Sequence, residues 1–105
     1  MMEPEEEPSI YIGYVSDYEL RRTMVRKLSR RRTIYAGMTT EEIRHVICYH
    51  SRHASVPGIN KYVTIEKVDK ILWKLYRRWI IYYDFDTNSR VPIYKIFDQH
   101  IPQQI

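Results

Sequence analysis

The chain has 105 residues, 44% of them apolar, and it carries 17 Lys and Arg against 13 Asp and Glu, for a net charge of +4. This length allows one modest domain, and the apolar share excludes a chain that is disordered throughout. A single cysteine, an acidic N-terminus and the lack of a long apolar run argue against secretion and membrane insertion. We therefore expect an intracellular protein, in the cytoplasm or nucleoid, or in the host cytoplasm if the source is viral.

Residues 1–8, MMEPEEEP, predict a disordered acidic tail, because two prolines and four glutamates leave nothing to form a core. The tail either solubilises the chain or competes with DNA for a basic surface elsewhere in the protein. Residues 9–98 are expected to form the one domain, and residues 99–105 a C-terminal tail.

Without the four glutamates the chain carries 17 basic and 9 acidic groups, a net charge of +8. A body with that excess attracts polyanions at low salt, and nucleic acid is the first partner to consider.

The first helix is expected to run from Asp17 to about Arg31. Ser16 and Glu19 form an S-x-x-E capping box, in which each side chain accepts a hydrogen bond from the backbone of the other residue. Apolar residues at helical spacing are expected to face the core: Leu20, Met24 and Leu28. Basic residues occupy the other faces: Arg21, Arg22, Arg26, Lys27, Arg30 and Arg31. The cluster from Arg26 to Arg32 either binds DNA phosphates or is a solvated face, and the sequence leaves both interpretations open.

Two elements are expected between the first helix and the middle of the chain. Residues 33–38, TIYAGM, are β-branched and aromatic residues that end in a glycine, and they predict a short strand. Thr39 and Glu42 form a second capping box and begin the second helix. Its inner face is expected to consist of Ile43, Val46, Ile47 and His50. Pro57 and Gly58 cannot continue a helix, so it ends before them.

The third helix has the clearest pattern in the chain. Thr64 is the expected N-cap, and Glu66 suits the positive end of the helix dipole. One face is apolar: Ile65, Val68, Leu72, Leu75 and Tyr76. The opposite face is basic: Lys67, Lys70, Lys74, Arg77 and Arg78.

The last element is expected to be a β-hairpin. Residues 79–85, WIIYYDF, and residues 91–97, VPIYKIF, are rich in strand-forming side chains. Residues 86–90, DTNSR, separate them and contain Asp, Asn and Ser, which stabilise turns through hydrogen bonds from side chain to backbone. Pro92 lacks an amide donor, which places the second strand at a sheet edge.

The order of helix, short strand, helix, helix and hairpin over residues 16–97 resembles the winged-helix branch of the helix-turn-helix superfamily. TIYAGMTTEEIRHVI resembles the family's first strand leading into its second helix. VDKILWKLYRRWIIYYDF, with its L-x-x-L end at Leu72 and Leu75, resembles a recognition helix that runs directly into the first wing strand. Trp79 stands where the family often has glycine, and the connection over residues 50–63 is longer than the family's shortest turns.

The resemblance implies an α+β fold, a three-helix winged helix-turn-helix with a C-terminal β-hairpin wing. It also implies a protein that binds double-stranded DNA, as a transcriptional regulator, with the third helix in the major groove and the wing beside it. The expected DNA contacts are Lys67, Lys70 and Lys74 in the groove, Arg77 and Arg78 on flanking phosphates, Asn88 and Arg90 at the wing tip, and Arg30 and Arg31 on the first helix. No enzyme activity, catalytic residue, cofactor or small-molecule ligand is expected, because the sequence has no phosphate-binding glycine loop and no nucleophile motif.

Several other interpretations stay open at this stage. Four residues have zinc-ligand side chains, although the paired cysteine spacing of zinc sites is absent and no metal is expected: His45, Cys48, His50 and His53. A winged helix that binds a protein partner instead of DNA is one alternative, and a protein that binds RNA or single-stranded DNA is another. The placement of the tyrosines discriminates between these alternatives. Tyrosines in a groove with the cations favour single strands, whereas tyrosines on the first helix or the N-terminal segment favour a homodimer, which is also expected for a DNA binder. The abundance of Ile, Tyr and Arg resembles small proteins of thermophilic archaea or their viruses.

Overall fold

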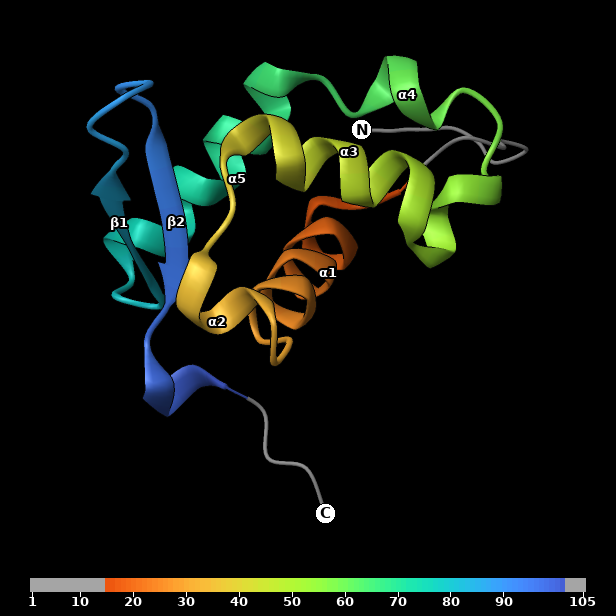
Figure 1. Ribbon diagram of the computed structural model, residues 1–105. Coiled ribbons are helices and arrows are strands. Elements are labelled where there is room, and N and C mark those ends of the chain that lie inside the picture. The colour runs from red at the N-terminus through yellow and green to blue at the C-terminus, as the bar shows by residue number, and fades with distance from the viewer. Residues whose placement is uncertain (1–14, 102–105) are drawn as a thin grey trace.

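The computed structural model describes residues 15–101, and these form an α+β fold of five α-helices and a C-terminal antiparallel β-hairpin (Figure 1). The elements are α1 (Asp17–Leu28), α2 (Thr33–Ala36), α3 (Thr40–His50), α4 (Ile59–Tyr62), α5 (Ile65–Arg77), β1 (Ile81–Phe85) and β2 (Pro92–Ile96), with short 3-10 helices at Arg52–Ser55 and Asp98–His100. The expected acidic tail, residues 1–8, lies outside the described residues. The hairpin lies at one side of the helices and α4 at the other (Figure 1).

The core lies between the three long helices, where α3 packs against both α1 and α5. The stripe predicted on α1 is confirmed, because Leu20, Met24 and Leu28 are fully buried. On α3, Ile43 and Ile47 are buried, whereas Val46 is only half-buried. The prediction is wrong for His50, which is exposed at the end of α3, and Cys48 is buried on the inner face in its place.

The inner face of α5 is rotated relative to the prediction. Ile71 is buried, although the pattern did not predict it on this face, and Tyr76, which was predicted there, is 37% exposed. The remaining buried residues of α5 are Val68, Leu72 and Leu75. The rotation places the edge that carries Lys67 against α1 and the edge that carries Tyr76 against the hairpin. The positions of the α5 cations follow from this rotation.

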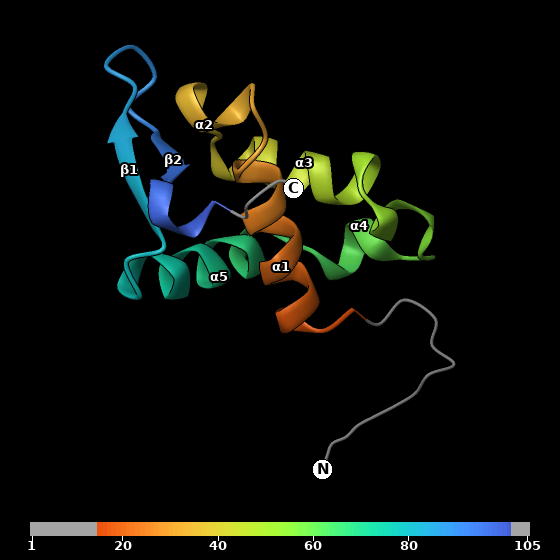
Figure 2. The ribbon, with the colours of Figure 1, turned by 90° about the horizontal axis from the view of Figure 1, so that it is seen from below.

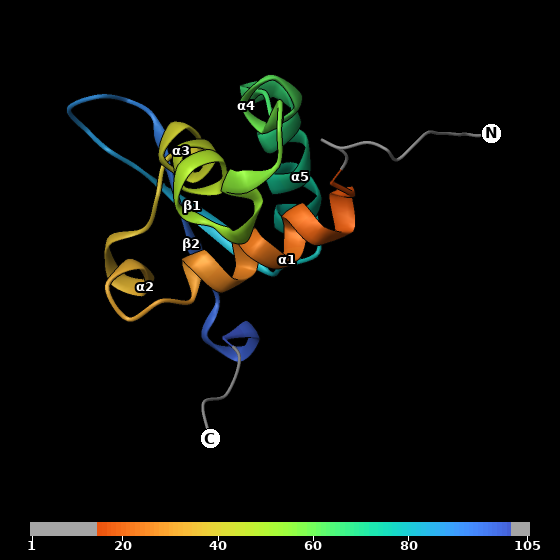
Figure 3. The same ribbon diagram turned by 90° about the vertical axis from the view of Figure 1, so that its right-hand side faces the viewer.

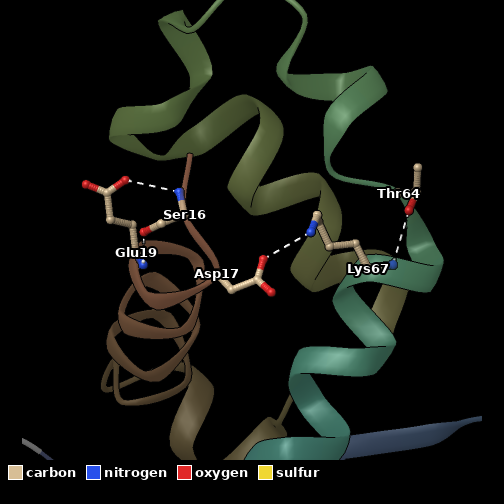
Figure 4. Close-up of polar contacts among 5 residues, drawn as sticks. All are labelled: Ser16, Asp17, Glu19, Thr64 and Lys67. Atoms are coloured by element: carbon tan, nitrogen blue, oxygen red, sulfur yellow. Dashed lines mark hydrogen bonds and ion pairs between the residues drawn. The ribbon is translucent and has the colours of Figure 1, made fainter. Parts of the chain in front are cut away.

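The predicted helix starts are confirmed. Ser16 Oγ accepts a hydrogen bond from Glu19 N at 3.1 Å, and Glu19 Oε1 accepts one from Ser16 N at 3.4 Å. The box at the start of α3 is complete as well. Thr64 Oγ1 accepts a hydrogen bond from Lys67 N at 3.1 Å at the start of α5 (Figure 4). These short motifs satisfy backbone amides that have no partner inside the helix.

The end of α1 comes three residues earlier than expected, at Leu28. Ser29 is the C-cap, and its hydroxyl donates to Val25 O at 2.6 Å. Arg30 and Arg31 therefore lie in the turn after the helix and not on a helix face.

The predicted strand over residues 33–38 is wrong for most of its length, because Thr33–Ala36 form α2. The amides of Thr33 and Ile34 donate to Arg30 O at 2.8 and 2.9 Å, which continues a helical turn. Gly37, at φ 72°, ends this helix. Of the predicted strand, only Met38 pairs with β2. Met38 and Tyr94 form an antiparallel bridge, with backbone N–O distances of 2.9 and 2.7 Å.

The end of α5 is built without glycine. Arg78 is the C-cap and Trp79 follows it with a left-handed φ of 60°. Trp79 N donates to Tyr76 O at 3.1 Å, and Ile80 N donates to Leu75 O at 3.0 Å. These two bonds form a Schellman motif, in which the left-handed position is ordinarily a glycine.

The predicted hairpin is confirmed, with strands two residues shorter than the apolar runs. Ile81 pairs with Ile96, and both side chains are buried in the core. The next pairs on the same face are Tyr83 with Tyr94 and Phe85 with Pro92, which extend past the core. The loop over residues 86–91 projects beyond the helices (Figures 2 and 3).

Candidate nucleic-acid interface

Three of the predicted cations lie free on the outer face of α5. Lys70, Lys74 and Arg77 are exposed, and none of them forms an ion pair or a side-chain hydrogen bond within residues 15–101. Trp73 lies between them in sequence and is 58% exposed. This face can approach a phosphate backbone without first breaking a contact within the described part of the protein.

Lys67, by contrast, forms an ion pair with a residue of the neighbouring helix α1. Its Nζ lies 3.0 Å from Asp17 Oδ1 of α1 (Figure 4) and 4.9 Å from the ring centre of Tyr62. Burial alone lowers the pKa of Lys67, but the hydrogen bond to Asp17 and the contact with Tyr62 outweigh it and raise the pKa above the ordinary value. Lys67 therefore joins α1 to α5, and a phosphate would have to compete with Asp17 for it.

Arg78 and Arg30 lie in a groove between α1 and the end of α5. We call it the arginine groove; it has a volume of about 690 Å³. It is lined by Tyr18, Arg21, Arg22, Val25, Arg26, Ser29, Arg30, Leu75, Arg78 and Ile80. Arg31 is exposed beside it but does not line it. The predicted site is thus divided between two surfaces, the outer face of α5 and this groove.

One basic side chain expected on the surface of α1 is buried. Lys27 is 7% exposed, and its Nζ donates to His50 O at the end of α3 at 2.9 Å. Burial lowers the pKa of Lys27, and the charges of Arg30 and Arg26 lower it further. The ammonium group satisfies a helix-end carbonyl, so Lys27 joins α1 to α3.

The predicted wing-tip residues lie in the hairpin loop, and both side chains are exposed. Asp86 organises this loop: its Oδ1 accepts from Asn88 N at 3.1 Å, its Oδ2 accepts from Ser89 Oγ at 2.6 Å, and its backbone carbonyl accepts from Arg90 N at 2.7 Å. The hydrogen bonds from Ser89 and Asn88 lower the pKa of Asp86. Arg90 has a left-handed φ of 60° and no side-chain partner within residues 15–101. Its guanidinium is therefore free to contact a ligand beside the loop.

An aromatic groove that the sequence pattern did not predict lies between α5 and the hairpin. This groove has a volume of about 420 Å³ and is lined by Trp73, Tyr76, Tyr83, Phe85, Pro92 and Tyr94. Trp73 and Tyr76 stack with ring centres 5.6 Å apart, and Tyr76 lies 5.5 Å from Tyr83. Phe85 is 60% exposed. The alternation of residues 81, 83 and 85 on one face of the strand could have indicated this aromatic surface. The rotation of α5 that brings Tyr76 to the groove could not be inferred from the sequence.

The tyrosines do not gather on one surface. Tyr76 and Tyr83 lie in the aromatic groove, and no Lys or Arg of residues 15–101 lines it. Tyr18 on α1 is 57% exposed and Tyr35 on α2 is 80% exposed, which leaves a dimer surface open. Tyr11 and Tyr14 lie outside the described residues.

The four residues considered as zinc ligands do not converge. His53 is buried, and its Nε2 lies 2.8 Å from Thr23 Oγ1 in a hydrogen bond to α1. Cys48 is a buried free thiol, and the rings of His45 and His50 lie 5.2 Å apart. Within residues 15–101, no group of three or more His, Cys, Asp or Glu side chains is placed to hold a metal ion.

None of the described helices combines the length and the apolar character that crossing a membrane requires. Comparison of the chain with protein-family models, with curated proteins and with solved structures found no match.

Proposed function

We propose that this chain is a winged-helix protein that binds double-stranded DNA and acts as a transcriptional regulator. In this proposal α5 is the recognition helix and enters the major groove, and the β1–β2 hairpin is the wing. The observation that carries it is the outer face of α5, where Lys70, Lys74 and Arg77 are exposed and unpaired among the described residues. An α-helix fits the major groove, and these side chains reach phosphates or guanine edges there.

The arrangement of the elements supports the winged-helix proposal. Met38 pairs with β2 just before α3, as a first strand would, and α5 runs into β1 through a three-residue turn. The hairpin loop projects beyond the helices and carries Arg90 (Figure 3). An exposed arginine on a projecting loop suits a narrow minor groove or its phosphates.

The experiment is a fluorescence anisotropy titration of random duplex DNA with the full chain over a range of salt concentrations. We expect Lys70→Ala/Lys74→Ala to weaken binding and to reduce the slope of log affinity against log salt by about 2, because each lost phosphate contact removes about 0.9. Arg52→Ala/Lys61→Ala is the matched control, since it removes two exposed cations outside α5. If wild type and both double variants bound the duplex equally well, α5 would not be part of the DNA interface.

Arg90 is tested separately. We expect Arg90→Ala to weaken duplex binding less than the double variant of α5, mainly at A·T-rich sequences with a narrow minor groove. An equal loss on all sequences would make Arg90 an ordinary phosphate contact.

A second candidate function is the binding of single-stranded nucleic acid, which the aromatic groove favours. Trp73 and Tyr76 alternate with the free cations along α5, and exposed Phe85 continues the groove onto the hairpin. Stacking of a base on an aromatic ring contributes about 1–3 kcal/mol. Tighter binding of a single strand than of a duplex of equal length, lost in Trp73→Ala/Phe85→Ala, would select this function. No binding of either at low salt would favour a protein partner.

A further inference from the structure

The arginine groove combines five guanidinium groups with an apolar floor. Arg21, Arg22, Arg26 and Arg30 come from α1 and the turn after it, and Arg78 comes from the end of α5. The floor consists of Val25, Leu75 and Ile80, and no acidic residue of the described part of the chain lines the groove. A ligand that fits must carry several negative charges and some apolar surface, which describes an acidic peptide segment better than an inorganic anion.

Neither of the acidic residues of α1, Asp17 and Glu19, forms an ion pair with these arginines within residues 15–101. Asp17 pairs with Lys67 at 3.0 Å, and Glu19 accepts the capping hydrogen bond from Ser16 N (Figure 4). None of the five groove arginines forms an ion pair within residues 15–101. Burial lowers the pKa of Lys27 and the charges of Arg30 and Arg26 lower it further, so these two arginines lie close enough to Lys27 to repel its charge.

The chain itself supplies a segment with the complementary chemistry. Residues 1–14, MMEPEEEPSIYIGY, contain four glutamates followed by two isoleucines and two tyrosines. This segment joins the structure at Val15, next to the start of α1, which forms one wall of the groove. An extended chain spans about 3.4 Å per residue, so Glu7 reaches about 27 Å from Val15. The twelve residues of α1 cover only about 18 Å, so the groove arginines of this helix, Arg21, Arg22 and Arg26, are within that reach.

We propose that residues 1–14 of this chain dock in the arginine groove, with their glutamates against the arginines and their apolar residues over the floor. The contact is intramolecular, so the segment is present at an effective concentration in the millimolar range whatever the protein concentration. Docking covers Arg30 and Arg78 and leaves the outer face of α5 open. The segment therefore excludes other polyanions from this groove, whether or not α5 binds DNA.

Paramagnetic relaxation enhancement in the full chain tests this proposal. A nitroxide is attached to Met2→Cys, and wild type treated with the same reagent is the blank, because Cys48 is buried and burial raises the pKa of its thiol. At low salt we expect the amide signals of residues 21–30 and of Arg78 to broaden. We expect this broadening to disappear in 0.5 M NaCl, where the Debye length is about 4 Å, and in Glu3→Gln/Glu5→Gln/Glu6→Gln/Glu7→Gln.

Two variants with equal charge localise the contact. Arg22→Gln/Arg26→Gln removes two groove arginines and should abolish the broadening, whereas Arg31→Gln/Arg32→Gln removes two exposed arginines outside the groove and should retain it. Equal loss in both variants, or broadening centred on Lys70 and Lys74, would overturn the proposal. A mixture of nitroxide-labelled unenriched protein with unlabelled ¹⁵N protein should show no broadening. Broadening there would assign the segment to the groove of a second copy and overturn docking within one chain.

Discussion

Gly37 shows how one residue can determine where a strand begins. It adopts a φ of 72°, and a Cβ at this position would lie 2.8 Å from the carbonyl oxygen of Tyr94 and 2.6 Å from the side chain of Ile93. The absence of a side chain lets α2 end directly against β2, so that Met38 can pair with Tyr94. A left-handed φ costs an L-residue about 1–2 kcal/mol, and a contact with backbone adds to that cost.

Substitution of Gly37 by alanine is therefore expected to destabilise the protein by roughly 2–4 kcal/mol, from the left-handed φ together with overpacking against β2. Gly58 provides a control for the left-handed φ, because it has a φ of 78° and no atom within 4 Å of the Cβ position. The two positions differ in ψ, which is 8° at Gly58 and -177° at Gly37, a combination that only glycine ordinarily adopts and that adds to the cost at Gly37. Gly58→Ala should cost only about 1 kcal/mol, from the backbone alone. Urea denaturation followed by circular dichroism measures both, and equal losses would show that the approach to β2 is unimportant.

His53 is expected to make stability depend on pH. Burial lowers its pKa, and the charge of Arg52 lowers it further, so the folded protein favours the neutral ring that hydrogen-bonds Thr23. In the unfolded chain the ring takes up a proton near its ordinary pKa of about 6.5. The unfolded state then binds more protons, so the free energy of unfolding falls as the pH decreases below about 6.5, until folded His53 is itself protonated.

Denaturation of wild type and His53→Gln at pH 7.5 and pH 5.5 checks this expectation. The glutamine variant keeps a hydrogen-bonding side chain but cannot titrate, so it should lose less stability than wild type between the two pH values. A loss of the same size in both proteins would assign the pH dependence to other groups.

At the scale of one element, the end of α5 stores backbone strain at Trp79. Its φ of 60° completes the Schellman motif, and its ring is 72% exposed, with a tilted contact to Phe97 at 6.4 Å. We expect Trp79→Gly to be more stable than Trp79→Ala by roughly 0.5–1 kcal/mol, because glycine removes the left-handed strain but gains freedom in the unfolded chain. Thermal unfolding compares the two variants, which both lack the ring. A more stable alanine variant would show that the position is unstrained in solution.

The elements that the sequence predicts correctly are those determined by local contacts. Capping at Ser16, Thr39 and Thr64 requires only residues three positions away, and the hairpin requires two β-rich runs and a turn. The segment over residues 33–36 has strand-forming side chains but becomes helical, since the Arg30 carbonyl accepts from two of its amides. Intrinsic strand preference is weak and tertiary context reverses it.

The sequence predicted which residues carry the positive charge of the candidate site, but it did not predict on which surfaces of the fold they lie. Helical periodicity placed five cations on one side of α5, and Lys70, Lys74 and Arg77 do lie exposed there. Lys67 and Arg78 lie next to the buried residue Ile71, on the same side of it on the helical wheel. The approach of α1 to this edge takes Lys67 into an ion pair and Arg78 into the arginine groove. Which helix covers an edge is decided by tertiary packing, which periodicity within one helix does not contain.

At the scale of the whole molecule, charge is distributed unevenly between the body and its first seven residues. All 17 Lys and Arg lie within residues 15–101, together with only nine Asp and Glu. A compact body with a net charge of +8 repels itself, and this repulsion lowers stability until salt or a bound anion screens it. The four N-terminal glutamates are the nearest source of compensating charge in the chain.

The neutralised variant Glu3→Gln/Glu5→Gln/Glu6→Gln/Glu7→Gln is therefore expected to unfold at a lower temperature than wild type in 0.01 M NaCl, by a few degrees. The Debye length there is about 30 Å, so the glutamates act on the whole body, whereas at 1 M it is about 3 Å and the two proteins should unfold together. Thermal scans followed by circular dichroism at both salt concentrations measure the difference. Equal unfolding temperatures at low salt would mean that the glutamates do not act on the folded body. A difference that persists at 1 M would mean that they act through contacts other than charge.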